Sequence, residues 1–158
     1  MPLLSYIAMQ QVAEILLVED NPGDVALTRK AFGKARYPVR LTVVEDGEEA
    51  LRRLRRESRC EDWITPDLVL LDLNLPGLNG REVLSAIKDD PQLCQVPVIV
   101  FSGSRDQADI AESYRRNANC YVVKPSQFRD LVALISSLAD FWLLHAKLPD
   151  VTAAETRK

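Results

Sequence analysis

The stretch LVLLDLNLPGLNG, Leu68 to Gly80, carries the clearest structural signal in the 158-residue chain. Five of its first six residues are leucine or valine, which is typical of a β-strand covered on both faces. The exception is Asp72, and the stretch then turns at Pro76-Gly77. Because a buried carboxylate without a partner is costly, Asp72 requires either a partner or a chemical role.

Short apolar strands alternate with helical patterns along the chain. The expected strands are 14–18, 39–44, 68–73, 96–101 and 120–123, and the expected helices start at Asn21-Pro22 or cover 47–57, 80–88, 106–116 and 127–145. This strict alternation predicts an α/β fold with a parallel sheet and helices on both faces. The segment 39–44 alternates polar and apolar residues, which predicts an edge strand.

The composition is that of an ordinary soluble domain, with 47% hydrophobic and 27% charged residues. The net charge of −3 argues against nucleic acid or an anionic membrane as the main partner. The basic run LRRLRRESR, 51–59, has leucine at helical spacing and is interpreted as a solvated helix face. No apolar run approaches the length of a membrane span.

Cysteine usage and the ends of the chain predict a cytoplasmic protein with one domain. Cys60, Cys94 and Cys120 are far apart and lack metal-ligand spacing with His145, so we expect reduced thiols. No basic residue precedes Arg29, which argues against a secretory signal. We expect a domain over 14–148, an N-terminal extension over 1–13 and a flexible tail over 149–158.

Polar residues follow the apolar strands at their carboxyl ends: Glu19 and Asp20, then Asp72, Ser102 and Lys124. In open parallel sheets such residues gather at one edge. Three converging carboxylates need a cation, and oxygen ligands favour Mg²⁺. An aspartate can itself accept a phosphoryl group, and a hydroxyl and an ammonium are suitable donors to that group.

Four segments in order resemble the receiver domain of two-component response regulators: VED at 18–20, LLDLNLPGLNG at 70–80, FSGS at 101–104 and YVVKP at 121–125. The resemblance covers about Ile15 to Leu138. It implies a flavodoxin-like (CheY-like), doubly wound, five-stranded parallel sheet of order 2-1-3-4-5 with five helices.

The resemblance also implies roles for individual residues. Asp72 corresponds to the phosphoacceptor, and Glu19 and Asp20 correspond to the acidic pair that holds Mg²⁺ or Mn²⁺. Asp72 itself and the backbone carbonyl of Asn74 complete the implied metal ligands. From the residues alone, Glu19 and Asp20 also fit a simple helix-capping role. The similar pair Glu45-Asp46, after the edge strand, is interpreted as a helix cap.

Three further residues match the family pattern. Ser102 stands at the position of the hydroxyl that turns toward the phosphoryl group, and Lys124 at that of the lysine that pairs with the acceptor. Tyr121 occupies the position of the switch aromatic. Their blander alternatives are a turn hydroxyl for Ser102 and a half-buried aromatic for Tyr121. The resemblance further implies that the Lys124-Pro125 bond is cis, which the sequence does not decide.

The end segment DFWLLHAKLP, together with NPGD and NCYVVKP, is similar to the small response regulators paired with cyanobacterial and bacterial phytochromes. That similarity implies a phytochrome-type sensor histidine kinase as phosphodonor. Because few residues follow the last expected helix, we expect no output domain and a signal that passes through the surface. The wide apolar face of that helix, from Phe128 to Trp142 and including Phe141, fits either unusually complete burial or contact with another chain. We expect a homodimer through this helix and the neighbouring elements.

Three other functions are alternatives to that of a phosphoacceptor. A phosphatase of the haloacid dehalogenase type needs a second aspartate two residues after the first, where this chain has Asn74. A flavin- or nucleotide-binding protein needs a phosphate loop after the first strand, where VEDNPGD is acidic. A phosphorylation-independent adaptor is disfavoured by the intact site residues. We therefore expect a phosphoacceptor with, at most, weak self-phosphorylation and self-dephosphorylation, and not an enzyme.

Overall fold

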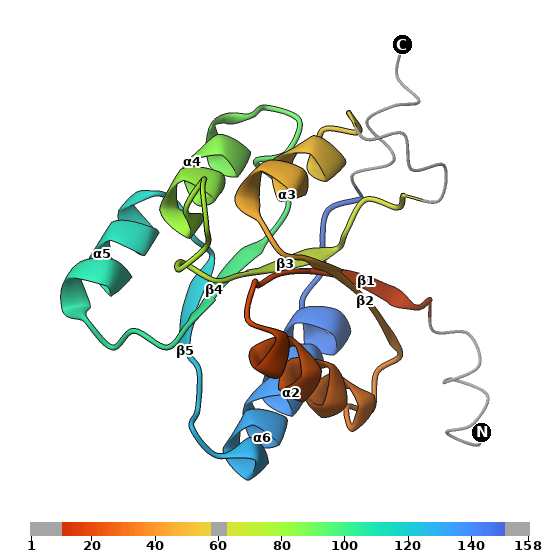
Figure 1. Ribbon diagram of the computed structural model, residues 1–158. Helices are drawn as coiled ribbons and strands as arrows, with labels where there is room; N and C mark the ends of the chain where they lie inside the picture. Colours follow the sequence, from red (N-terminus) through yellow and green to blue (C-terminus); the bar gives the residue numbers. More distant parts are fainter. Residues whose placement is uncertain (1–10, 58–62, 151–158) are drawn as a thin grey trace.

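The computed structural model describes residues 11–57 and 63–150. Its strands are β1 (Ala13–Val18), β2 (Val39–Val44), β3 (Leu68–Leu71), β4 (Val98–Ser102) and β5 (Cys120–Val123). They pair in parallel in the order β2-β1-β3-β4-β5 (Figure 1). The predicted sheet is confirmed, with β2 at an edge.

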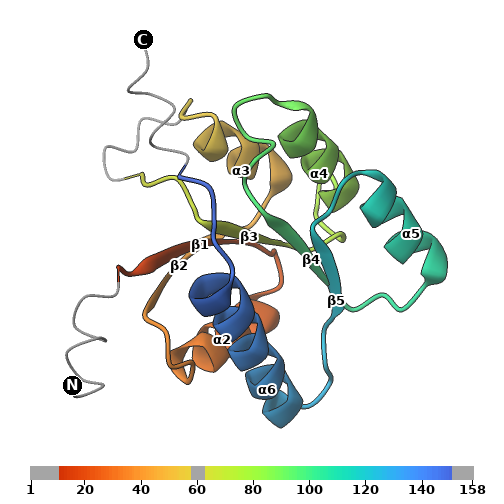
Figure 2. The ribbon, with the colours of Figure 1, turned by 180° about the vertical axis from the view of Figure 1, so that it is seen from behind.

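Helices cover both faces of this sheet. They are α2 (Pro22–Gly33), α3 (Gly47–Leu54), α4 (Gly80–Asp89), α5 (Gln107–Arg115) and α6 (Phe128–Ala139), followed by the π-helical segment η1 (Asp140–His145). The two opposite views show α2 and α6 together on one face and α3, α4 and α5 on the other (Figures 1 and 2). The doubly wound α/β architecture is therefore as predicted.

Alternate residues of the central strands supply the two halves of the core. In β1, Leu16 and Val18 pack into the cluster under α3 and α4, whereas Ile15 and Leu17 pack into the cluster under α2 and α6. All four are at most 1% exposed. Because the central strands are packed on both sides, the residues just beyond their carboxyl ends have fixed positions.

Helix starts follow the predicted caps. The Asn21 side chain accepts a hydrogen bond from the N–H of Asp24 at the start of α2, with Pro22 in the first turn. The Asp46 side chain accepts one from the N–H of Glu49 (2.7 Å) at the start of α3, so its capping interpretation is confirmed. Capping of α2 falls to Asn21, and not to Glu19 or Asp20.

Some predicted bounds were too long. α3 ends at Leu54 and not at Glu57, because Arg56 adopts a left-handed φ of 59° that ends the helix. β3 ends at Leu71, where the chain leaves the ladder before the Asp72 turn. β4 starts at Val98 and not at Val96, because Pro97 has no N–H to donate to a ladder.

The last helix covers Phe128 to His145, close to the predicted range, but it changes type within that range. The α-helix ends at Ala139, and a π-helical turn follows in which the N–H of Ala146 bonds to the carbonyl of Phe141 (2.7 Å). The wider turn divides the apolar residues that follow. Trp142 packs partly against the core, whereas Phe141 and Leu144 are 57% and 42% exposed.

The structure also describes the basic face of α3, two of the cysteines and the length of the helices. The basic face of α3 is largely paired, since Arg52 and Arg53 both contact Glu49. The Arg53 guanidinium lies 5.7 Å from the ring centre of Trp63, which packs on the core. Cys94 and Cys120 are free thiols. Within the described ranges no helix is long and apolar enough to cross a membrane.

Two structural details concern the ends and the proline bond. No peptide bond in the described part of the chain is cis, so Lys124-Pro125 is trans, unlike the geometry that the resemblance implied. Residues 1–10 of the expected extension, 58–62 with Cys60, and 151–158 of the expected tail lie outside the described residues.

Candidate functional site

An acidic cluster lies at the carboxyl edge of the sheet, where β1 and β3 end side by side. The N–H of Asp72 bonds to the carbonyl of Val18 (3.0 Å), which ties the two strand ends together. Glu19, Asp20 and Asp72 each bring a carboxylate oxygen to within 4.8 Å of the others. Glu19 and Asp72 are buried, at 1% and 6% exposure, while Asp20 is exposed. The structure therefore brings the three predicted acids together.

Lys124, which follows β5, places its ammonium group among these carboxylates. Its Nζ donates to Asp72 Oδ2 (3.0 Å), to Asp24 Oδ2 (2.9 Å) and to Glu19 Oε2. Burial alone would lower the pKa of Lys124, but the hydrogen bonds to Glu19 and Asp24 and the charge of Asp72 raise it above its ordinary value. Lys124 therefore remains a cation and balances part of the negative charge.

Burial acts on the pKa of Glu19 in the opposite direction, because it favours the neutral form of a carboxylic acid. Burial raises its pKa to about 7, against the lowering effects of Lys124 and of the Asn21 N–H, which donates to Glu19 Oε1 (3.0 Å). Protons and a divalent cation would therefore compete for this carboxylate near neutral pH.

Asp24 was missed by the sequence analysis, although it contacts Lys124. It lies in the first turn of α2, where its N–H is held by the side chain of the N-cap residue Asn21 (3.0 Å). From that position the Asp24 carboxylate accepts a hydrogen bond from Lys124 Nζ, just beyond the end of β5 (2.9 Å). The available signal was the NPGD segment, since Asn21 as N-cap places Asp24 three residues into the capped turn.

The turn after Asp72 is built for close packing. The N–H of Asn74 donates to Asp72 Oδ1 (3.2 Å), and Gly77 has the positive φ of 66° that favours glycine. Asn79 then caps α4, forming a capping box with Glu82. A Cβ on Gly80 would lie 2.1 Å from the carbonyl oxygen of Asp72, so only glycine lets α4 begin against the strand end.

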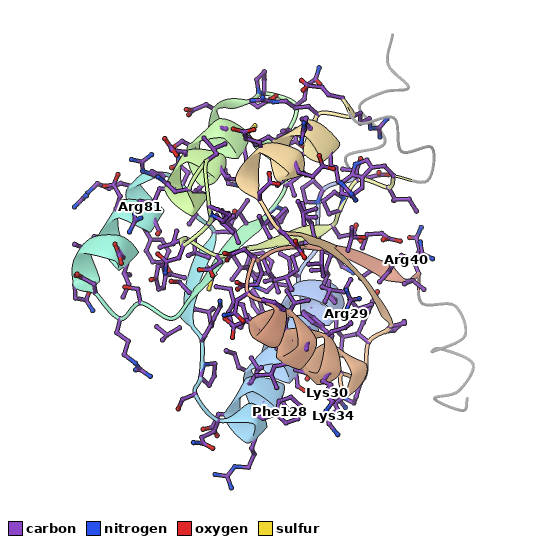
Figure 3. All side chains as sticks on the ribbon, viewed as in Figure 1. Arg29, Lys30, Lys34, Arg40, Arg81 and Phe128 are labelled. Carbon is purple, nitrogen blue, oxygen red and sulfur yellow. The ribbon has the colours of Figure 1, made fainter. Side chains whose placement is uncertain are left out.

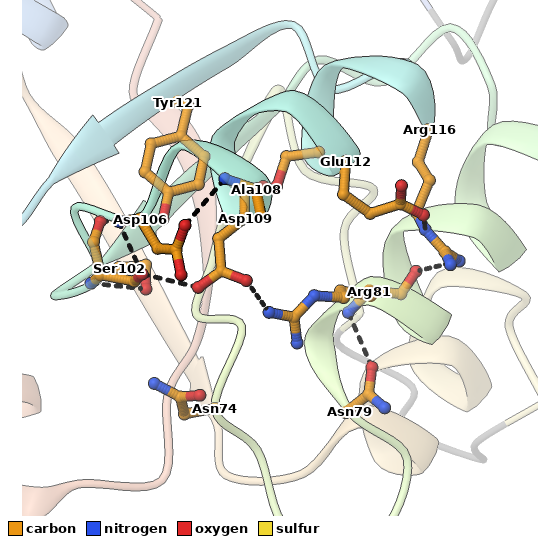
Figure 4. A network of polar contacts seen from close by, with 12 residues as sticks. Asn74, Asn79, Arg81, Ser102, Asp106, Ala108, Asp109, Glu112, Arg116 and Tyr121 are labelled. Atoms are coloured by element: carbon orange, nitrogen blue, oxygen red, sulfur yellow. Dashed lines mark hydrogen bonds and ion pairs between the residues drawn. The ribbon is translucent and has the colours of Figure 1, made fainter.

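Ser102 and Tyr121 meet at the loop after β4. Ser102 is fully buried, and its Oγ accepts a hydrogen bond from the N–H of Ser104 (3.2 Å). The half-buried Tyr121 donates its hydroxyl to the carbonyl of Ser104 (3.0 Å). Figure 4 shows Tyr121 and Ser102 close up. The backbone N–H of Lys124 bonds to the carbonyl of Ser102 (2.8 Å). Ser102 and Tyr121 therefore both form a hydrogen bond with Ser104.

The donor set fits a hard divalent cation. All three clustered acids offer oxygen, and none of the nearby side chains offers nitrogen or sulfur as a ligand in the described part of the chain. Mg²⁺ and Mn²⁺ are bound by such carboxylate and carbonyl oxygens. The carbonyl of Asn74, two residues after Asp72, stays a predicted fourth protein ligand.

A doubly wound sheet with acids and one lysine at its carboxyl edge defines a receiver domain. Residues 15–136 match the response regulator receiver domain family, and the chain belongs to this family. The response regulator Rcp1 of Synechocystis sp. is 37% identical over 135 residues, which are 85% of this chain and 92% of Rcp1.

Two solved structures show the same similarity. The phosphorylated cyanobacterial phytochrome response regulator RcpA superposes with a TM-score of 0.84 at 41% identity, over 89% of this chain and all of that one. The Mn²⁺-bound form of Rcp1 gives a TM-score of 0.80 at 36% identity, over 87% of this chain and 99% of that one. The resemblance noted in the motifs is thus confirmed at the level of the family.

Proposed function

We propose that this chain accepts a phosphoryl group on Asp72 from a sensor histidine kinase, with Mg²⁺ as the expected metal. The observation that carries the proposal is the convergence of Glu19, Asp20 and Lys124 on the buried Asp72 carboxylate. In the transfer, an oxygen of Asp72 forms a bond to phosphorus while the bond to the donor breaks, so Asp72 must be ionised and accessible from the acidic side.

Each neighbouring group has a defined part in this proposal. Glu19, Asp20, Asp72 and the Asn74 carbonyl would hold the metal, which when bound supplies positive charge for the phosphoryl oxygens. Lys124 supplies a second positive charge in contact with Asp72.

The loop after β4 has the remaining roles. Ser102 would donate its hydroxyl to a phosphoryl oxygen, and Tyr121 would follow the resulting movement of the loop. In this scheme the protein is a phosphoacceptor, and any self-phosphorylation or self-dephosphorylation is weak.

The acceptor assignment is tested with a small phosphodonor. The protein is mixed with Mg²⁺ and acetyl phosphate, and its intact mass is measured. We expect a gain of one phosphoryl group in the wild type, and none in Asp72→Ala or after removal of the metal with a chelator. The matched control is Glu45→Ala, which removes an exposed acid at the end of the neighbouring strand β2 and should leave labelling unchanged. Equal labelling of Asp72→Ala would refute the assignment.

A phytochrome-type kinase is the proposed phosphodonor, and the cytoplasm is the proposed location of the protein. The support is the similarity to Rcp1 and to RcpA, of which RcpA is a cyanobacterial phytochrome response regulator. Transfer from a phosphorylated phytochrome kinase should be faster than transfer from a histidine kinase of another sensor class, measured as loss of label from each kinase. Equal rates with both donors would contradict this pairing.

A homodimer through α6 and η1 is the proposed signalling form. Phe141 and Leu144 expose apolar surface on η1, next to the packed Trp142. In sedimentation experiments, Phe141→Glu should shift the protein toward monomer, whereas Arg129→Glu, on an exposed position of α6, should not. Unchanged sedimentation of Phe141→Glu would exclude this surface.

A further inference from the structure

Within the described residues Ser104, in the loop from β4 to α5, makes four hydrogen bonds, in one of which its hydroxyl accepts the N–H of Asp106 (3.2 Å). Its N–H donates to Ser102 Oγ (3.2 Å), and its carbonyl accepts the hydroxyl of Tyr121 (3.0 Å). Its own hydroxyl donates to Asp109 Oδ2 in α5 (2.6 Å). Ser104 thus connects the buried Ser102 and the half-buried Tyr121 to the first turn of α5.

The other carboxylate oxygen of Asp109 is bound by the guanidinium of Arg81 in α4. Figure 4 shows the two side chains pointing toward each other across the space between the helices. Arg81 lies apart from the basic side chains Arg29, Lys30 and Arg40 of α2 and β2 (Figure 3).

Arg81 also follows directly on Gly80, which packs against the backbone of Asp72. A continuous set of contacts therefore runs from the proposed acceptor through the start of α4 to Asp109, and from there through Ser104 to Ser102.

We propose that Arg81, acting through Asp109 and the Ser104 hydroxyl, is a positioning residue that holds the Ser102 loop in its unphosphorylated geometry. This proposal rests on the proposed function, because it concerns the hydroxyl that would meet the phosphoryl group on Asp72. Ser102 Oγ now accepts the N–H of Ser104, so a movement of this loop toward a phosphoryl group disturbs the contact of Ser104 with Asp109. Phosphorylation must then release contacts that Arg81 stabilises.

The charge state of Asp109 agrees with this role. Its hydrogen bonds with Ser104 and with Arg81 hold the pKa of the Asp109 carboxyl below its ordinary value. Asp109 is therefore ionised at neutral pH and binds both partners at once. An ion pair that only joined α4 to α5 would not need the second contact with the loop.

The test measures how fast Asp72 is labelled by acetyl phosphate and Mg²⁺ in Arg81→Gln, in Ser104→Ala and in the double variant. Each single change should raise the labelling rate about three- to tenfold, the size expected from the net contribution of one ordinary hydrogen bond. The double variant should match Ser104→Ala, because that change already breaks the contact through which Arg81 and Asp109 reach the loop, together with the bond from the Asp106 N–H. Arg81→Lys, which keeps a cation near Asp109, should return the rate toward that of the wild type.

The matched control is Arg115→Gln, which removes an exposed ion pair with Glu112 on the same helix α5. It should leave the labelling rate unchanged. Urea unfolding of every variant separates a change in rate from a loss of stability. Single variants that label at the wild-type rate or more slowly, or that add fully in the double variant, would overturn the positioning role. A wild type that is not labelled at all would instead refute the proposed function.

Discussion

Gly80→Ala would place a methyl group where the chain has no room for one. The new Cβ would lie 2.1 Å from the carbonyl oxygen of Asp72 and 2.5 Å from the Cα of Leu73. Both are backbone atoms, so no side chain can rotate out of the way. Gly80 is also buried between the end of β3 and the start of α4, and its N–H bonds to the carbonyl of Leu73 (3.0 Å).

The magnitude follows from these distances. Carbon atoms pack at roughly 3.5–4.0 Å, so the start of α4 or the Asp72 backbone must move by about 1 Å. Forced overpacking of this kind costs about 3 kcal/mol, while alanine gains up to about 1 kcal/mol over glycine in a helix. We therefore expect a net loss of about 2 kcal/mol, which lowers the melting temperature by roughly 4–8 °C.

The same displacement should reach the chemistry. A shift of about 1 Å in the acceptor geometry is expected to slow phosphoryl transfer to Asp72 on the order of 10²-fold. The assay is the rate of labelling by acetyl phosphate and Mg²⁺, measured beside urea unfolding. The control is Gly33→Ala at the end of α2, since a Cβ on Gly33 meets nothing within 4 Å.

Gly33→Ala should keep the stability and labelling rate of the wild type to within small factors. If Gly80→Ala is as stable as the wild type and is labelled as fast, the close approach of α4 to the acceptor strand has no functional importance and the reasoning fails.

Three further variants test the charges and the cap around Asp72. Without metal, the raised pKa of Glu19, about 7 against an ordinary 4.5, contributes stability that is complete below pH 4.5 and lost as the pH rises through 7. Urea midpoints should therefore fall over this pH range in the wild type but not in Glu19→Gln. A flat wild-type profile would count against burial as the cause of the raised pKa. Lys124→Met leaves buried carboxylates without their cation, and it should lower the free energy of unfolding without metal by about 3–5 kcal/mol. Mg²⁺ should restore part of this loss, and a loss below about 1 kcal/mol would contradict the reasoning. Asn79→Ala removes the α4 capping box and should cost about 1 kcal/mol, a value that an unchanged urea midpoint would exclude.

The sequence was most informative where local pattern and chemistry agree. The apolar run before Asp72 predicted a central strand because burial on both faces removes any need for polar residues, and β3 is fully buried. Asn21 and Asp46 were predicted as caps because their side chains satisfy N–H groups in the adjacent turn. The order of the strands came from the resemblance, since local pattern does not determine which strands pair.

Contacts between distant segments could not be predicted in the same way. Asp24 meets Lys124 across 100 positions of sequence, and Arg81 meets Asp109 across 28. Both pairings depend on the angles at which helices leave the sheet, and periodicity does not encode those angles. The π-helical turn after Ala139 was also missed, because its apolar residues fit an α-helical period nearly as well.

Locating the phosphoryl group is the most direct test of the central claim. Protein labelled with acetyl phosphate and Mg²⁺ is treated with borohydride, which reduces an acyl phosphate to an alcohol, and the digested peptides are sequenced by mass spectrometry. The reduced side chain should be that of Asp72, and it should be missing when the metal is removed. A reduced side chain at Asp20 or Asp24 in place of Asp72, or labelling that does not require a metal, would contradict the account.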